Sequence, residues 1–264
     1  ALLDRIQQDF PAAAQPVLIE GVRRLIDYQD PAYAAQYLDR LKALAQGAQA
    51  DALLPEAARH LALWMSYEDT VRVAELKTRD TRFARVRAEL RLDAQAPLNL
   101  HEFMHPRLEE ICDTLPAGLG RWLAGSGWPR RLVERFTQQG RTVATTSLRG
   151  FLLLYLVSGF KRWRRGSLRF AVETQRIEQW LAQLQATAAL NPQLAAEVAR
   201  CQNLVKGYGD THERGLRNFE TLMAAVRRAG AQLAPATLRE LREAALADEH
   251  GRQLQAALQR HALA

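Results

Sequence analysis

The residues most indicative of metal chemistry are His101 and His105, in the string HEFMH at 101–105. The string matches the H-E-x-x-H pattern of zinc peptidases, in which two histidines one helical turn apart bind zinc and the glutamate is the general base. That chemistry needs a continuous helix, yet Pro106 follows the second histidine and Pro97 stands four residues before the first. We therefore predict a loop leading into a helix at Pro106 and no metal site. A metallohydrolase stays the alternative that metal analysis would test.

A second unusual string is LVKGYGDTHERG at 204–215. Gly207 and Gly209 are typical of a helix end, and Asp210, with Glu213 three residues later, suits the N-cap of the next helix. Amides at a helix N-terminus attract anions. Two interpretations stay open, a structural helix–helix corner and a ligand or subunit-contact site. The residues of that second interpretation are Lys206, Tyr208, Asp210, His212 and Arg214.

Two adjacent carboxylates, Glu68 and Asp69, stand in the string SYEDT at 66–70. Helical periodicity places this string in the middle of a long helix over 55–90. Arg72 follows at a spacing that brings it within reach of both carboxylates. The pattern predicts an internal ion-pair network rather than a carboxylate pair for acid–base catalysis.

Positive charge is concentrated between residues 121 and 170. This window holds eleven Lys and Arg and a single acid, a net charge of +10 against −3 for the rest of the chain. Its densest part contains Lys161, Arg162, Arg164 and Arg165. Guanidinium forks on a rigid base suit phosphate or carboxylate recognition, so we predict that these four bind an acidic ligand or partner. A solvated structural face is the alternative. No nucleic-acid motif accompanies the 121–170 window, which we call the basic belt.

Helices must position all of these groups. Ala, Leu, Gln, Glu and Arg dominate, Val and Ile are scarce, and apolar residues recur with the helical period. The predicted fold is an all-α, irregular domain of about ten helices over 1–264, with a subdomain seam near 91–105 as an alternative. Three early helices end near 30, 47 and 90. The later ones are expected at 106–112, 129–139, 146–163, 167–187, 192–206, 211–228, 235–247 and 250–261.

The longest apolar run is FLLLYLVSGF at 151–160. It is shorter than the roughly 20 residues of a membrane span, and Arg149 and Lys161 bracket it closely. We predict a buried core helix and no membrane association.

Composition limits the class of protein. The chain has 264 residues, 48% hydrophobic and 25% charged, which is typical of globular proteins and excludes a disordered or fibrous chain. Its two cysteines, Cys112 and Cys201, cannot hold a four-thiolate iron–sulfur cluster or form a disulfide framework. A reducing cytoplasm is therefore expected. The chain opens at Ala1 without a signal-peptide pattern, so we expect a piece of a longer polypeptide.

Five long strings carry a resemblance to a known family. They are DYQDPAYAAQYLDRL at 27–41, LALWMSYEDTVRVAELKTR at 61–79, HPRLEEICDTLPAGLGR at 105–121, TTSLRGFLLLYLVSGFKRWRRGSLRFA at 145–171 and LVKGYGDTHERG at 204–215. Over about 16–230 the chain resembles the C-terminal helical domain of bacterial indolepyruvate ferredoxin oxidoreductases.

The resemblance implies a 2-oxoacid:ferredoxin oxidoreductase, which decarboxylates aryl pyruvates on thiamine pyrophosphate, reduces ferredoxin through iron–sulfur clusters and forms acyl-coenzyme A. This chain has no cysteine-rich cluster motif and no Gly-Asp-Gly segment for the magnesium of thiamine pyrophosphate. Thiamine pyrophosphate, Mg and iron–sulfur clusters are therefore expected elsewhere in the enzyme.

The role expected of this domain is structural, in subunit assembly, or in docking coenzyme A or ferredoxin. Its expected partners are the other domains or subunits of the oxidoreductase. No catalytic residue can be carried over to it, and in isolation it should be inactive. A free-standing helical module that binds acidic partners is the alternative.

Overall fold

The protein forms fifteen α-helices, four 3₁₀-helices and one two-stranded sheet within the residues that its structure, a computed structural model, describes. The all-α prediction is confirmed. The α-helices outnumber the predicted ten partly because the long helix expected over 55–90 is broken into three. The described residues are 1–47, 50–93, 96–104, 107–125, 127–137, 141–207 and 209–263, without the side chains of 50, 103, 104, 134, 136, 137, 141 and 142.

The chain divides into two compact units. The first unit comprises Ala1–Tyr67 and Gln175–Ala264, and the second unit comprises Glu68–Thr174. The chain passes between them after Tyr67 and again after Thr174, within helix α11 (Leu168–Leu190). Neither passage lies at 91–105, where the sequence indicated an alternative seam.

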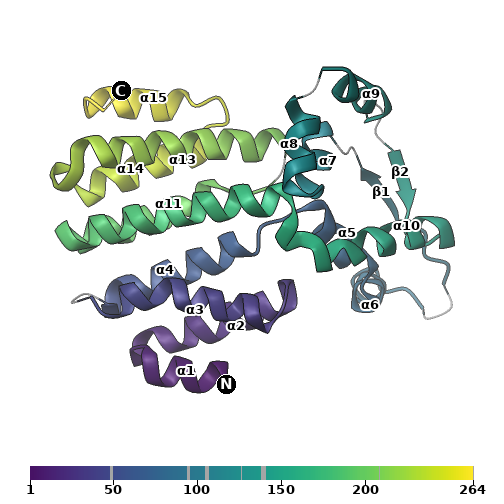
Figure 1. The fold of residues 1–264 in the computed structure, drawn as a ribbon, viewed down its shortest axis with the longest axis horizontal. Coiled ribbons are helices and arrows are strands. Elements are labelled where there is room, and N and C mark those ends of the chain that lie inside the picture. Colours follow the sequence, from purple (N-terminus) through teal and green to yellow (C-terminus); the bar gives the residue numbers. More distant parts are fainter. Residues whose placement is uncertain are drawn as a thin grey trace. The chain divides into compact units, whose positions relative to one another are not determined.

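The first unit is a stack of helices (Figure 1). Helices α2, α3 and α4 pack against one another, α4 contacts α12, and α14 contacts α12, α13 and α15. Besides most of α11, its elements are α1 (Leu2–Asp9), η1 (Ala12–Ala14), α2 (Gln15–Tyr28), α3 (Pro31–Ala45), α4 (Ala50–Met65), α12 (Pro192–Arg200), η3 (Cys201–Leu204), α13 (Gly209–Ala229), η4 (Gly230–Gln232), α14 (Pro235–Ala247) and α15 (Arg252–Arg260).

Two of these helices begin at side-chain caps followed by proline. The Asp30 carboxylate accepts a 2.7 Å hydrogen bond from the backbone N–H of Tyr33, with Pro31 as the first residue of α3. Asn191 caps α12 in the same way before Pro192. A cap oxygen satisfies an N–H that has no partner inside the helix, and proline at that position loses no hydrogen bond.

Aromatic side chains fill the core of the first unit. Trp64 and Trp180 are buried with ring centroids 5.6 Å apart, and Phe219 meets Trp64 edge-on at 5.2 Å. The buried hydroxyls of Tyr33 and Tyr37 donate to the carbonyls of Met65 and Ala58. The ring contacts and these two hydrogen bonds stabilise the interior of the first unit.

The second unit has a short sheet among its helices (Figure 1). Strand β1 pairs antiparallel with β2, so that His101 faces Ala144 and Met104 faces Arg141. Apart from the start of α11, its elements are α5 (Thr70–Thr78), α6 (Asp80–Glu89), β1 (His101–Met104), α7 (Leu108–Thr114), α8 (Ala117–Gly125), α9 (Gly127–Thr137), β2 (Arg141–Ala144), α10 (Leu148–Gly159) and η2 (Phe160–Gly166).

The core of the second unit is small. One buried cluster contains Leu108, Cys112, Leu123 and Leu168. Elsewhere α10 packs against α5. In the part of the chain that the structure describes, no helix is both long and apolar enough to cross a bilayer.

Candidate functional site

The HEFMH string is a strand, not a loop, over its first four residues. His101–Met104 form β1, while His105 and Pro106 lie outside the described residues. The predicted loop is wrong because these residues pair with β2, forty residues further along the chain. Glu102 is ion-paired with both Lys77 and Arg82. The zinc-peptidase pattern needs residues four apart to lie one helical turn from each other, whereas in a strand such residues are roughly 13 Å apart.

The described residues offer no thiolate site for the iron–sulfur clusters of the enzymes that the chain resembles. Cys112 and Cys201 are free, buried thiols, one in each unit. Burial raises the pKa of Cys201 to about 12, which disfavours the thiolate that binds metal. Among the described residues, no group of three or more His, Cys, Asp or Glu could hold a metal ion. The expectation that cofactors bind elsewhere in an oxidoreductase remains a prediction.

The 204–215 string is a close contact between η3 and α13. A Cβ at Gly215 would lie 2.0 Å from the Leu204 carbonyl oxygen, so only glycine allows this approach. Gly207 has φ +73°, a conformation that favours glycine. Helix α13 begins at Gly209, so Asp210 lies in its first turn rather than at the predicted N-cap. These features favour the structural interpretation of the string.

The predicted site residues of this string are in different environments. Lys206 and Asp210 are exposed, whereas His212 is buried on α13. Arg214 is half-exposed and forms a 3.8 Å ion pair with Glu249. Tyr208 lies outside the described residues.

The SYEDT string lies at a break between helices, so its predicted position inside a long helix is wrong. Helix α4 ends at Met65 and α5 begins at Thr70. Asp69 caps α5 by accepting a 2.6 Å hydrogen bond from the backbone N–H of Arg72. The helical period continues across such a break, and therefore the pattern hides it.

The strongest contact of the basic belt joins Arg164 to this cap. Its Nε and Nη2 donate to the two carboxylate oxygens of Asp69, at 2.7 and 3.1 Å. Both side chains are largely buried. A bidentate guanidinium–carboxylate pair holds both groups in a fixed geometry. Arg164 therefore ties η2 to the start of α5 and is engaged inside the protein.

The other three predicted cations differ in exposure. Lys161 is half-buried. Burial raises the pKa of Glu75, but hydrogen bonds from Arg79 and Arg72 and the charges of Arg72 and Lys161 bring it below its usual value. Arg162 and Arg165 are exposed. The four cations thus do not present one common surface.

The apolar run 151–160 lies in α10 and η2, and its predicted burial is wrong for most of its residues. Of α10, Gly150 and Leu154 are buried. Seven large apolar side chains of α10 and η2 are exposed to solvent, from 44% for Phe160 to 74% for Leu148. We call this set the α10–η2 face: Leu148, Leu152, Leu153, Tyr155, Leu156, Phe160 and Trp163. Large exposed apolar patches are the kind of surface that a partner covers, so this face is the candidate functional site.

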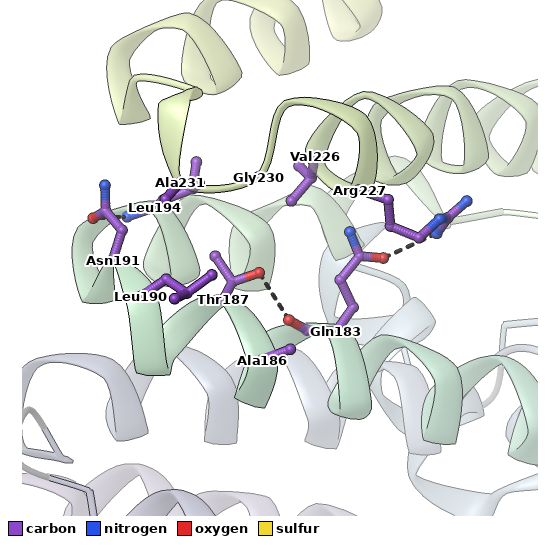
Figure 2. A pocket seen from close by; sticks show the side chains of 10 residues that line it. All are labelled: Gln183, Ala186, Thr187, Leu190, Asn191, Leu194, Val226, Arg227, Gly230 and Ala231. Atoms are coloured by element: carbon purple, nitrogen blue, oxygen red, sulfur yellow. Dashed lines mark hydrogen bonds between the residues drawn. The ribbon is translucent and has the colours of Figure 1, made fainter.

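A hollow on the surface of the first unit is a weaker candidate for a binding site than the α10–η2 face. It has a volume of about 230 Å³ and lies where α11, α12 and α13 meet η4. Figure 2 shows the Thr187 hydroxyl bonded to the backbone of Gln183, and the Gln183 side chain bonded to Arg227. The Asn191 side chain caps α12. These polar groups are engaged within the protein, and the hollow supplies little chemistry for a ligand.

Sequence reasoning missed a buried ion network in the first unit. Glu197 accepts from Arg200 at 2.6 Å, Arg239 at 3.0 Å and Arg242 at 2.8 Å. The contacts span 3 to 45 residues along the chain. Of these, the pair with Arg200 had a sequence signal, its i,i+3 spacing on α12.

The chain was compared with protein families, curated proteins and solved structures. A family model, described as a family of unknown function (DUF6537), matches residues 14–225. No curated protein and no solved structure gives a significant match.

Proposed function

Since the chain belongs to the family of unknown function DUF6537, which does not itself give an activity, we propose from its own residues that it is an accessory helical domain of an indolepyruvate-type 2-oxoacid:ferredoxin oxidoreductase. Its role is to dock onto another domain or subunit of that enzyme. The proposal includes a contribution to binding ferredoxin or coenzyme A, and a cytoplasmic location. The resemblance of the five strings supports the enzyme context.

The observation that carries the docking role is the α10–η2 face. Water-exposed apolar area is unfavourable, by about 25 cal/mol for each Å² that a partner could remove from water. The longest string of the resemblance, 145–171, contains the whole face. The longest string of the resemblance is therefore also the segment that carries the exposed apolar face.

Thiamine pyrophosphate, Mg and iron–sulfur clusters have no part in what this chain does under the proposal. Its own residues contribute a rigid apolar surface and nearby cations. Isolated residues 1–264 should show no turnover with indolepyruvate and no iron–sulfur absorption band after anaerobic purification.

The test uses the whole polypeptide that carries residues 1–264. It is purified anaerobically and assayed for indolepyruvate-dependent ferredoxin reduction in the presence of coenzyme A. A matched polypeptide lacking these residues is examined by size-exclusion chromatography for loss of assembly. The proposal requires activity in the first sample. Absence of this activity in a cofactor-loaded sample would reject the enzyme context.

The alternative is a free-standing module that binds acidic partners. Arg149 and Arg162 favour it, because both are exposed and form no ion pair among the described residues. Under this alternative the chain binds its partner with equal affinity whether or not oxidoreductase subunits are present, which a pull-down with purified components measures.

A further inference from the structure

We infer that the α10–η2 face binds a protein surface that is apolar at its centre and carries a carboxylate paired with Arg149. The inference rests on the proposed docking role and adds the chemistry of the partner. It names Arg149 as the residue that selects that partner.

Arg149 lies in the first turn of α10, on the same side of the helix as three leucines of the face. Leu152, Leu153 and Leu156 follow it at i+3, i+4 and i+7, the spacings that share one side of a helix. All three leucines are exposed, and so is Arg149. Within the described part of the chain, its guanidinium forms no hydrogen bond or ion pair. Any partner that covers the leucines also removes this charge from water.

A covered guanidinium needs a fixed anion. An ion taken out of water without a partner is strongly unfavourable, whereas a bidentate carboxylate satisfies both its charge and its N–H donors. The face therefore discriminates between partners. An apolar surface without a carboxylate at this place leaves the charge unpaired, and a wholly acidic surface leaves the leucines without apolar contacts.

The face is held rigidly, which suits recognition of one partner. At one end, Ser147 caps α10 by accepting from the backbone N–H of Gly150. A Cβ at Gly150 would lie 2.1 Å from the Ala144 carbonyl oxygen, so the helix approaches the end of β2 as closely as glycine allows. At the other end, Arg164 fixes η2 to Asp69. A rigid surface loses little conformational entropy on binding.

Charge argues against two other occupants. Residues 148–166 contain no acid but several cations, so two copies of the face would oppose like charges. A bilayer would receive the leucines but offers no fixed carboxylate within its hydrocarbon for Arg149. Both occupants are outcomes of the test below.

The first experiment identifies the occupant by site-specific photo-crosslinking. A benzophenone amino acid replaces Leu156 in the whole polypeptide, assembled with its subunits, and the crosslinked peptide is identified by mass spectrometry. We expect a peptide from another domain or subunit with an Asp or Glu within a few residues of the crosslink. A crosslink to a second copy or within residues 1–264, a peptide without a nearby acid, or no crosslink in the assembled complex would overturn the inference.

The second experiment tests Arg149 itself. We expect Arg149→Glu to weaken association of the purified components about 100-fold, measured as Kd by interferometry, because a buried charge pair becomes a like-charge contact. Changing the mapped carboxylate to Arg should restore binding to Arg149→Glu and weaken binding to the native chain. Arg252→Glu is the matched control, since Arg252 is exposed on α15 of the first unit and forms no ion pair among the described residues. Unchanged Kd for Arg149→Glu, or no rescue by the exchanged charges, would overturn the inference.

Sedimentation with vesicles of 3:1 phosphatidylcholine and phosphatidylglycerol completes the test. We expect the chain to stay in the supernatant. Vesicle binding that Leu156→Gln abolishes would assign the face to lipid and overturn the inference. If the whole enzyme is active while nothing covers the α10–η2 face, this inference is rejected and the enzyme context is kept. If the face crosslinks to an acidic partner but the polypeptide has no oxidoreductase activity, only the enzyme context is rejected.

Discussion

The five tryptophans separate the two units. Trp64 and Trp180, in the first unit, are 2% and 1% exposed. Trp122, Trp128 and Trp163, in the second unit, are 54%, 73% and 70% exposed. The same contrast holds for other large apolar side chains, since the six residues of the α10–η2 face besides Trp163 also belong to the second unit.

Buried charged groups occur in both units, since the second unit buries Arg164 and Glu173. The first unit buries Glu197 with its arginines, and it also buries His60, whose ring nitrogen is 3.1 Å from the Gln202 side-chain oxygen. A helical stack that satisfies such groups internally has a well-defined structure without a partner. The two units therefore differ in how completely they cover their large apolar side chains, since the first buries its tryptophans and the second leaves its own exposed. The four predictions below test that difference.

The largest effect is expected at Glu197. Glu197→Gln leaves buried Arg242 without its carboxylate, so the free energy of unfolding of the first unit should fall by about 3–5 kcal/mol. Urea denaturation followed by the fluorescence of Trp64 and Trp180 measures it. Glu20→Gln is the control, because exposed Glu20 pairs with Arg23 in solvent, and its loss should change the free energy by less than about 1 kcal/mol. Similar small changes in both variants would contradict a stabilising network.

The next effect is expected at Arg164 in the second unit. Arg164→Met leaves the Asp69 carboxylate with its cap bond but without its cation, and should destabilise the second unit by about 2–3 kcal/mol. Hydrogen exchange of the α5 and α10 amides under native conditions measures the change. Arg162→Met, two residues earlier and exposed, should stay within about 0.5 kcal/mol. Equal exchange in the two variants would show that the Arg164–Asp69 pair contributes nothing.

A smaller effect is expected from the protonation of His60. Burial lowers the pKa of His60, against the opposing effects of the hydrogen bond that its ring N–H donates to the Gln202 side-chain oxygen and of the charge of Glu56. In the unfolded chain histidine has its usual pKa of about 6.5. The unfolded state therefore takes up the proton first, and the free energy of unfolding should fall as the pH drops below about 6.5, by at most about 1.4 kcal/mol per pH unit. The decrease should stop once the pH is below the folded-state pKa.

Denaturation at pH 7.5 and 5.5 tests this prediction. His60→Gln keeps a polar partner for Gln202 but does not titrate, so the pH-dependent loss should be smaller in this variant. An identical loss in the variant and the native chain would assign the pH dependence to other groups.

The smallest effect on stability is expected on the α10–η2 face. Leu156→Gln should change the free energy of unfolding by less than about 0.5 kcal/mol, because Leu156 is exposed in the folded chain. It should also lower the binding of a hydrophobic dye. By contrast, Leu61→Ala in the core of the first unit should cost about 2–5 kcal/mol. A loss above 1 kcal/mol for Leu156→Gln would show that the folded chain itself covers this leucine.

Local patterns in the sequence were sufficient to predict much of the fold. The helical class and many helix positions follow from the spacing of apolar residues and from signals such as Asp30-Pro31 and Asn191-Pro192, because these act within one helical turn. The charge of the 121–170 window also follows from composition alone.

Tertiary structure alone decided which of these residues are available to a partner. The sequence cannot show that Arg164 pairs with Asp69, 95 residues away, or that His101–Met104 find a strand at Arg141–Ala144. It also predicted a buried helix over 151–160, because hydrophobicity measures the tendency of a side chain to leave water and not whether the chain supplies enough neighbours to cover it. In α10 those neighbours cover Leu154 and leave Leu148, Leu152 and Leu156 exposed, so the segment forms an exposed apolar face rather than a core helix.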